Sequence, residues 1–334
     1  MNIGIIGLGY WGPNLLRNFA AQTGAVGHLT CCDINEQRIN NIRPFYPSVE
    51  FTLNADEILR STKIDAVVIA TPVATHFDFA QRALRAGKHV FIEKPMTLRS
   101  ADSEELLEMA EGRNLKIMVD HTFVFTGAVR KIKEVHDNGE LGDIIYFDSV
   151  RVNLGLFQHD VNVIWDLATH DISIMDYIIP ARPISVSALG IHHINNLEDV
   201  AYITLFLENN IIAHLHVNWL APVKVRTMLI GGNKKMVVYN DMETSEKVKI
   251  YDKGVDIITK EGVYQTLIQY RTGDMRAPKI DQTEALSLAV GNFIEAVDKG
   301  SEPITNGQAG LRVVKILEAA QTSLKNEGKL IKIN

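Results

Sequence analysis

The sequence predicts an α/β protein that begins with a doubly wound parallel sheet of the Rossmann type and continues into a second α/β domain with a mostly antiparallel sheet. Up to residue 120, short apolar runs alternate with helical stretches, and a glycine-rich turn follows the first run directly. Beyond residue 120, several strand-like runs follow one another with few helices between them. We therefore expect domains at residues 1–120 and 121–334.

The first domain is predicted to consist of βαβ units. Its apolar runs are short and rich in Val and Ile, as expected for parallel strands that are covered on both faces. The helical stretches between them are the crossover connections that parallel strands require. The expected strands lie within residues 2–7, 28–33, 64–70, 88–93 and 115–120, and the expected helices begin near Pro13 and Asn35 and span 75–87 and 101–113.

The second domain is predicted to combine a mostly antiparallel sheet with a few helices. Consecutive strand-like runs without intervening helices favour antiparallel pairing, because hairpins are short connections. Expected helices span 127–139, 163–179, 284–300 and 309–325. Expected strands span 143–152, 184–193, 199–208, 211–219, 224–232 and 234–240.

Composition narrows the class of protein. The 334 residues are 46% hydrophobic and 22% charged, with a formal net charge of −6, which argues against nucleic acid as the main partner. No apolar run reaches the roughly 18 residues of a membrane span, and a strand expected from residue 2 leaves no room for a signal peptide. The only cysteines, Cys31 and Cys32, are adjacent and point to opposite faces of a strand. We therefore expect a reduced, cytoplasmic protein without a membrane partner.

The segment "GLGYWG", residues 7–12, predicts a dinucleotide site. Gly7 permits a tight turn, Gly9 lets a pyrophosphate approach the backbone, and Gly12 lets the helix pack closely on the strand. The free N–H groups at the start of the following helix would face the phosphates. The motif alone is weak, but it lies between an expected strand and an expected helix, as the function requires.

Asp33 indicates which dinucleotide binds. It ends the second expected strand, 21 residues after Gly12, where a carboxylate accepts a hydrogen bond from the adenosine ribose. A carboxylate there would repel a 2′-phosphate, and no basic residue follows before Arg38. The sequence therefore favours NAD over NADP. The alternative is a glycine turn without nucleotide, with Asp33 as a helix cap.

Polar segments follow two further expected strands. "ATP" (residues 70–72) and "EKP" (residues 93–95) come at the carboxyl ends of neighbouring strands, which is where ligands bind in a doubly wound sheet. We therefore expect Glu93 and Lys94 to line a crevice next to the nicotinamide.

Four segments together resemble the Gfo/Idh/MocA family of NAD(P)-dependent oxidoreductases: "GLGYWG", "TPVATH", "EKP" and "DLATHD". The resemblance spans nearly the whole chain. It implies action on sugars, inositols or sugar derivatives, and a C-terminal domain whose large open sheet mediates a homodimer or homotetramer. It also implies a cis peptide bond between Lys94 and Pro95.

By this resemblance, Lys94, Asp166 and His170 match the catalytic residues of the family. Asp166 and His170 are four residues apart and share one face of a helix. Alcohol oxidation needs a base for the hydroxyl proton, which suits His170, and an ammonium that stabilises the forming alkoxide, which suits Lys94. Asp166 would position the alcohol. The opposite assignment, with Lys94 as the base and His170 as the group that stabilises the alkoxide, is equally compatible with the sequence. No third ligand with clear spacing accompanies Asp166 and His170, so we expect no metal.

The remaining candidates come from the same segments or precede the catalytic helix. The expected cofactor-binding residues are Gly7, Gly9, Tyr10, Trp11, Gly12, Asp33, Thr71, Pro72, His76, Glu93 and Lys94. The expected substrate-binding residues are Lys94, Arg151, Asn153, Asn162, Asp166 and His170, with His159 as a weaker candidate. For His76, a role at the start of a helix is an equal alternative.

Two further patterns stand out. His214 and His216 alternate along one expected strand, which marks a solvent or oligomer face. Asp120 stands where the family resemblance leads us to expect a small or neutral residue. Asp120 and His121 either adjust the chemical properties of the site or have only the structural role of ending a strand.

The substrate remains open at this stage. The segments "VNVIWDLATHDISIMDYI" and "WLAPVKVR" resemble family members that act on nucleotide-linked sugars such as UDP-N-acetylglucosaminuronic acid. A diphosphate would need a cation, which Arg151, Lys224 or Arg226 would supply. The alternatives are a dehydrogenase of free inositols or monosaccharides and a non-catalytic NAD-binding sensor or regulator.

Overall fold

A computed structural model describes residues 1–155, 157–258 and 267–333. The chain divides into two compact units, and each combines segments that are distant in sequence. Unit 1 comprises Met1–Phe125 and Thr283–Glu318. Unit 2 comprises Thr126–Gln282 and Ala319–Asn334. Unit 1 thus contains the expected nucleotide-binding region together with a segment from near the C-terminus.

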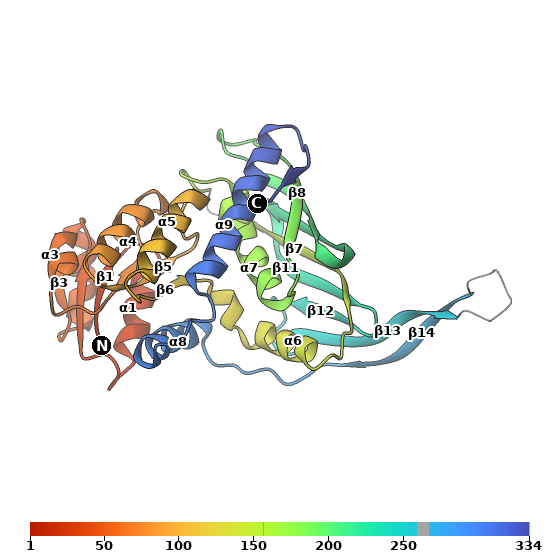
Figure 1. Cartoon of the computed structure of the whole chain (residues 1–334), viewed down its shortest axis with the longest axis horizontal. Helices are drawn as coiled ribbons and strands as arrows, with labels where there is room; N and C mark the ends of the chain where they lie inside the picture. Colours follow the sequence, from red (N-terminus) through yellow and green to blue (C-terminus); the bar gives the residue numbers. More distant parts are fainter. Residues whose placement is uncertain (156, 259–266, 334) are drawn as a thin grey trace. The chain divides into compact units, whose positions relative to one another are not determined.

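Unit 1 is built on a parallel six-stranded sheet with the strand order β3-β2-β1-β4-β5-β6 (Figure 1). This is the order of a doubly wound dinucleotide-binding sheet, with its reversal point between β1 and β4. Its strands are β1 (Asn2–Ile6), β2 (His28–Cys32), β3 (Glu50–Thr52), β4 (Ala66–Ile69), β5 (His89–Glu93) and β6 (Ile117–Asp120). Its helices are α1 (Gly12–Ala20), α2 (Glu36–Ile42), α3 (Ala55–Arg60), α4 (His76–Arg85), α5 (Ser100–Glu111) and α8 (Ala285–Lys299), with the first part of α9 (Gly307–Lys325) and the short turns η1 (Arg43–Phe45), η2 (Val73–Thr75) and η3 (Thr122–Phe125).

Local sequence explains where the helices of unit 1 begin. Pro13 occupies the first turn of α1, where a missing N–H costs nothing. Asn35 and Asn54 cap α2 and α3, because their side-chain oxygens accept hydrogen bonds from the first free N–H groups. All four residues of β4 are buried, so continuous apolar sequence forms the centre of the sheet.

The C-terminal segment of unit 1 packs beside β6. Thr305 donates from its hydroxyl to the Val119 carbonyl at 2.7 Å, and Met118 forms a bridge with Asn306. Lys116 pairs with Glu302 at 2.5 Å. The edge of the sheet at β6 is therefore covered by residues almost 200 positions later in the chain.

Unit 2 is built on a nine-stranded sheet with the order β14-β13-β12-β11-β7-β10-β9-β8-β15 (Figure 1). Every pairing is antiparallel except that between β7 and β10. Its strands are β7 (Ile144–Leu154), β8 (Pro183–Ile191), β9 (Val200–Leu207), β10 (Ile211–Asn218), β11 (Leu220–Gly232), β12 (Met236–Asn240), β13 (Val248–Ile258), β14 (Leu267–Arg276) and β15 (Ile331–Lys332). Its helical elements are α6 (Gly127–Asp137), η4 (Ile164–Ala168), α7 (Thr169–Ile178), η5 (Glu208–Asn210) and the end of α9.

The predicted fold class is confirmed in both units: a parallel sheet is followed by a mostly antiparallel one. The expected cis bond between Lys94 and Pro95 is present. The strand β3 and the pair β13 and β14 were not among the expected strands. Among the described residues, the structure contains no candidate for a membrane-spanning helix.

A buried ion pair holds α7 against β7 in unit 2. Arg151 on β7 contacts Asp171 on α7 through Nη2 at 2.6 Å and Nε at 2.7 Å, and Ser149 donates to the other carboxylate oxygen at 2.8 Å. Arg151 is 3% exposed and Asp171 is fully buried. Because α7 carries His170, this pair fixes the helix on which a catalytic candidate lies.

We expect the Arg151→Met variant to lose about 3–5 kcal/mol of unfolding free energy, because Asp171 would keep a buried charge without its cation. The double variant Arg151→Met/Asp171→Leu should recover much of that loss, since it removes both charges. Urea unfolding followed by circular dichroism measures these free energies.

The matched control is Arg130→Met, which breaks the more exposed pair with Asp281 at 3.2 Å. Its loss should stay within about 1 kcal/mol. Equal losses at the two sites would show that the buried pair holds α7 no better than a surface contact does.

Candidate functional site

The glycine turn after β1 has the shape of a phosphate cradle. Gly7 has a φ of 101°, which favours glycine, and a Cβ on Gly12 would lie 2.1 Å from the Gly7 carbonyl oxygen. A Cβ on Gly9 would instead project into open space, where the nearest described atom is Arg38 Nη1 at 3.8 Å. Gly7 and Gly12 therefore serve the packing of the turn, while Gly9 leaves the backbone open to a ligand. These residues fit a dinucleotide pyrophosphate.

Asp33 lies directly beside this turn. One carboxylate oxygen accepts from the Leu8 amide at 2.7 Å, and the other accepts from the Asn35 amide at 2.8 Å. Arg38 Nη1 lies 3.4 Å from the first of these oxygens. The Asp33 side chain is 4% exposed and that of Arg38 is 52% exposed. The carboxylate thus has lone pairs left for ribose hydroxyls, and the half-exposed guanidinium of Arg38 lies next to it.

His76 joins the two polar turns that follow β4 and β5. It is 1% exposed, and its Nδ1 and Nε2 lie 2.9 Å from the carbonyl oxygens of Pro95 and Thr71, respectively. Because both partners are acceptors, an imidazolium donates to both and a neutral ring to only one. His76 is therefore a positioning residue for the "EKP" turn. The half-buried Thr71 and the exposed Pro72 lie on the other turn.

The ends of β5 and β6 bring two carboxyl groups together. Glu93 and Asp120 are neighbours in the sheet register, and each carboxyl group influences the pKa of the other. Asp120 also accepts from Thr122 Oγ1 at 2.7 Å and from Trp11 Nε1 at 3.1 Å. Burial raises the pKa of Glu93 well above its ordinary range, and the neighbouring Asp120 raises it further. Burial also raises the pKa of Asp120.

Lys94 and His121 complete this cluster. The positive charge of the half-buried Lys94 acts on Glu93, Asp120 and His121. His121 is 1% exposed, and neither ring nitrogen has a hydrogen-bond partner among the described residues. Burial lowers the pKa of His121 to about 3, and Lys94 contributes to the shift. His121 is thus an uncharged imidazole at neutral pH.

In unit 2, Asp166 and His170 lie on consecutive helical segments. Asp166 belongs to the π-helical turn η4, and His170 belongs to the first turn of α7. Four residues are slightly more than one α turn and slightly less than one π turn, so the two side chains stay on one side of the helix. Asp166 Oδ2 accepts from Trp219 Nε1 at 3.1 Å, which fixes the carboxylate. Both residues are half-buried.

Two of the other expected substrate residues, Arg151 and Asn162, have partners within unit 2. Arg151 is engaged with Asp171, as described above. Asn162 is 3% exposed and donates to Glu198 at 2.7 Å and Gln321 at 2.8 Å. Asn153 is half-buried on β7, and His159 is exposed. A direct role of these residues in substrate binding stays a prediction.

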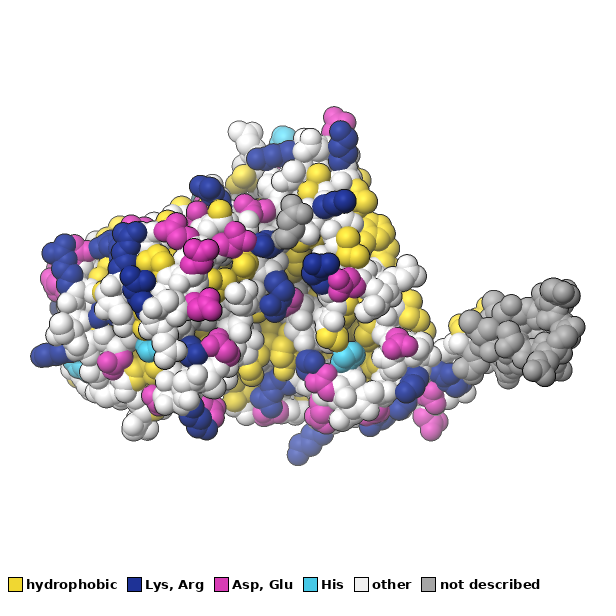
Figure 2. All heavy atoms as spheres, viewed as in Figure 1, with side chains coloured by type: hydrophobic (Ala, Val, Ile, Leu, Met, Phe, Trp, Pro, Cys, Tyr) yellow, Lys and Arg dark blue, Asp and Glu magenta, His cyan; other side chains and the backbone are white. Residues whose placement is uncertain are grey.

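One face of the nine-stranded sheet exposes apolar and aromatic side chains. Tyr202 on β9 stacks on His216 and His214 of β10, with ring centroids 4.5 and 6.4 Å apart. Hydrophobic side chains are visible on the surface of unit 2 (Figure 2). Further exposed apolar residues of these strands are Leu189, Ile191, Phe206, Ile212 and Leu229. Assembly of a dimer or tetramer through this sheet stays a prediction, which light scattering can test.

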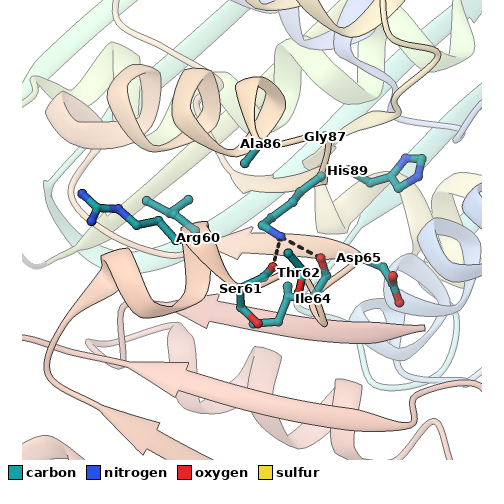
Figure 3. Close-up of a pocket in the computed structure, with 10 residues that line it drawn as sticks. Arg60, Ser61, Thr62, Ile64, Asp65, Ala86, Gly87 and His89 are labelled. Carbon is teal, nitrogen blue, oxygen red and sulfur yellow. Dashed lines mark hydrogen bonds between the residues drawn. The ribbon is translucent and has the colours of Figure 1, made fainter.

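A hollow of about 610 Å³ lies at the opposite edge of the parallel sheet, near the amino ends of β4 and β5 (Figure 3). Lys88 donates there to the carbonyls of Ser61 at 2.5 Å and Ile64 at 2.8 Å. Burial lowers its pKa. The ammonium satisfies backbone oxygens after α3, so Lys88 has a structural role.

Comparison with known proteins matches two successive regions of the chain to the same protein family. The Gfo/Idh/MocA oxidoreductase family with an NAD-binding Rossmann fold matches residues 1–121, and the C-terminal domain of the same family matches residues 129–238. The chain belongs to the Gfo/Idh/MocA family. It is therefore an NAD-dependent oxidoreductase, in agreement with the cofactor and the enzyme class predicted from the sequence.

Curated relatives and solved structures of this family match nearly the full chain. UDP-N-acetylglucosamine 3-dehydrogenase of Acidithiobacillus ferrooxidans is 26% identical over 323 residues, which is 94% of each chain. Inositol 2-dehydrogenase of Rhizobium meliloti is 23% identical over 82% of this chain and 83% of its own. A structure of levoglucosan dehydrogenase with NADH and L-sorbose superimposes with a TM-score of 0.84 at 18% identity, covering 100% of this chain and 99% of that one. The structural match supports the fold.

Two contacts in unit 1 were not predicted from the sequence. The contact between Glu93 and Asp120 depends on sheet register, and the only sequence signal was the unusual acidic residue at 120. The position of Arg38 against Asp33 was visible only as a basic residue five positions later. Among the described residues, no group of three or more His, Cys, Asp or Glu side chains is placed to hold a metal ion.

We expect Asp33→Ala to weaken NAD binding more than NADP binding, because the carboxylate would bond a ribose hydroxyl but repel a 2′-phosphate. Loss of a hydrogen bond to a charged group is worth about 1.5–3 kcal/mol, or roughly 10- to 150-fold in affinity. Calorimetric titration with each cofactor measures the ratio.

In the double variant Asp33→Ala/Arg38→Ala, the relative gain for NADP should disappear, since Arg38 is the cation next to the 2′ position. Equal weakening of both cofactors by Asp33→Ala alone would remove Asp33 from the ribose site.

The buried neutral His121 should make unfolding depend on pH. The unfolded chain binds a proton below about pH 6.5, while folded His121 resists protonation until about pH 3. Its contribution to stability is therefore complete above pH 6.5 and lost as pH falls toward about 3, by about 1.4 kcal/mol per pH unit at most. Urea unfolding at a series of pH values should show a shallower loss in His121→Phe.

The control is His192→Phe, the same substitution at an exposed histidine. It should leave the dependence of the unfolding free energy on pH as it is in the parent protein. A parallel profile for His121→Phe and the parent would mean that His121 is protonated in the folded state.

Proposed function

We propose that this enzyme transfers a hydride between NAD and a secondary alcohol of a sugar, with a nucleotide-linked sugar as the favoured substrate. The supporting observation is the match to a UDP-N-acetylglucosamine 3-dehydrogenase along 94% of both chains. The chain also retains a lysine, an aspartate and a histidine in the motifs that carry family catalysis. A pure NAD sensor would not need all three.

In this proposal His170 takes the hydroxyl proton of the sugar. Lys94 stabilises the negative charge that grows on the oxygen, and Asp166 positions the alcohol. The Trp219 hydrogen bond keeps the Asp166 carboxylate in one direction. NAD, when bound, supplies the acceptor for the two electrons and the hydrogen that leave the carbon. The roles of Lys94 and His170 remain exchangeable.

A diphosphate in the substrate would need a cation from unit 2. Arg151 is buried against Asp171, and Arg226 lies 3.3 Å from Asp241. Lys224 on β11 is exposed. Of the three cations considered, Lys224 is therefore the best placed to reach a phosphate, and we propose it as the diphosphate contact.

A free inositol is the second candidate substrate. The relative named inositol 2-dehydrogenase aligns along 82% of this chain. Inositols carry secondary alcohols that the same three residues could oxidise, but they have no phosphate. The two candidates therefore differ in whether the enzyme needs a cation remote from the reacting carbon.

A substrate panel with NAD distinguishes these candidates. We expect NADH absorbance to appear with a UDP- or dTDP-linked sugar and not with free inositols or hexoses. With the active nucleotide sugar, Lys224→Ala should raise KM and leave kcat nearly unchanged, because the diphosphate does not react. Turnover only with inositols would replace the first candidate by the second.

Lys94→Ala and His170→Ala should each lower kcat by about 10²–10⁴-fold, the usual contribution of an acid or base at the reacting group. Binding of NAD, measured by calorimetry, should persist in both variants. The exposed His192→Ala is the control for loss of an imidazole and should keep the parent rate. A parent rate in His170→Ala would exclude His170 as the base.

A further inference from the structure

Two acidic side chains meet at the carboxyl edge of the parallel sheet, where an ionised pair would be unfavourable. β5 and β6 run side by side in the register Glu93↔Asp120, so both side chains leave the sheet at the same level. Asp120 is 1% exposed. Glu93 is half-buried as a residue, but its Oε1 is sealed from solvent. Two adjacent carboxylates in such a place repel each other strongly.

The hydrogen-bond donors around the pair are unevenly divided between the two carboxyl groups. Asp120 accepts hydrogen bonds from Trp11 Nε1 and from Thr122 Oγ1, and two such bonds stabilise an ionised carboxylate. Glu93 Oε2 receives the Lys94 backbone amide at 3.2 Å, whereas Oε1 receives no N–H or hydroxyl donor among the described residues. Two buried carboxyl groups at neighbouring positions of a sheet avoid mutual repulsion when one of them keeps its proton. The arrangement therefore assigns the proton to Glu93 and the charge to Asp120.

Among the described residues, few charged or titratable groups lie next to this pair. From the turn after β5, Lys94 contributes a positive charge that acts on both carboxyls. From the turn after β6, His121 contributes a neutral imidazole, and Thr122 an uncharged hydroxyl. From the glycine turn, Trp11 contributes an uncharged N–H. With one proton, the pair carries a single negative charge beside Lys94.

The pair lies on the half of the sheet that the second nucleotide of a dinucleotide covers. The glycine turn after β1 binds the pyrophosphate, and the two mononucleotide halves extend to either side of the reversal point between β1 and β4. Asp33, at the end of β2, marks the adenosine side. The ends of β4, β5 and β6 then belong to the nicotinamide side, and Trp11 links the glycine turn to Asp120.

We propose that Glu93 and Asp120 form a one-proton pair that senses the charge of the nicotinamide, losing the shared proton more readily beside the oxidised ring than beside the reduced one. The oxidised ring carries one positive charge and the reduced ring none. The positive charge of the oxidised ring therefore stabilises the doubly ionised pair. The reduced ring has no such charge, so beside it the pair keeps its shared proton more readily. The proton exchanges with solvent, so no further reactant is needed.

This linkage has a definite sign. Raising the pH removes the shared proton and makes the pair more negative, so NAD⁺ binds more tightly relative to NADH. By reciprocity, NADH binding takes up more protons than NAD⁺ binding. Because the pKa of Glu93 is raised, the pair should lose its shared proton at a higher pH than an ordinary carboxyl group does. The inference depends on NAD as cofactor and holds whatever alcohol is the substrate.

The experiment is calorimetric titration of the full-length protein with NAD⁺ and with NADH between about pH 5 and pH 9. In the parent, the ratio Kd(NAD⁺)/Kd(NADH) should fall with rising pH, by at most about tenfold per unit for one linked proton. Titrations in buffers of different ionisation enthalpy should show greater proton uptake with NADH. In Asp120→Asn, which keeps one acceptor oxygen for Trp11 or Thr122, both effects should move to lower pH, because Glu93 loses the charge of Asp120 and keeps only the effect of burial.

Glu93→Gln should abolish the pH dependence, and Thr122→Val, which spares both carboxyls, should keep it. Glu111→Gln, an exposed carboxyl at the end of α5, is the control and should behave as the parent. A ratio that is independent of pH in the parent, or the same pH profile in the parent and in Asp120→Asn, would overturn the proposal. Neither outcome depends on turnover, so failure here is distinguishable from failure to find a sugar substrate.

Discussion

Parallel pairing of β1, β4, β5 and β6 brings four strand ends to one edge of a sheet, and the chemistry of unit 1 depends on that edge. Residues far apart in sequence become neighbours because each strand ends at the same level as the next. The glycine turn, the turn after β4 and the "EKP" turn are connected there. His76 bonds to the carbonyls of two of these turns, and Trp11 reaches Asp120 from the third.

Electrostatics at this edge is governed by burial more than by net charge. The chain is acidic, yet burial opposes ionisation around Lys94, since it raises the pKa of Glu93 and lowers that of His121. In the proposed one-proton state, Lys94 and Asp120 are the charged groups of the cluster. A bound molecule whose charge changes by one unit therefore has a large effect on this cluster, because charges interact strongly where water is excluded.

The sequence was informative where function depends on local spacing. The glycine turn, Asp33 and the alternation of strands and helices are patterns within a few tens of residues, and they predicted the parallel sheet and the cofactor. β13 and β14 were missed because charged residues such as Lys249, Asp252 and Arg271 interrupt their apolar pattern, and β3 because it has three residues at a sheet edge. The partners of Arg151 and Asp120 follow from tertiary register, which no local pattern encodes.

The return of residues 283–318 to unit 1 has a consequence for biosynthesis. During translation, the segment up to Phe125 leaves the ribosome long before the residues that cover the β6 edge, since all of Thr126–Gln282 is made in between. The early chain can form the sheet but lacks the contacts of Glu302, Thr305 and Asn306 with β6. Exposed apolar strand edges invite association with other chains and binding by chaperones. Completion of the nucleotide-binding unit therefore waits until residues 283–318 have been made.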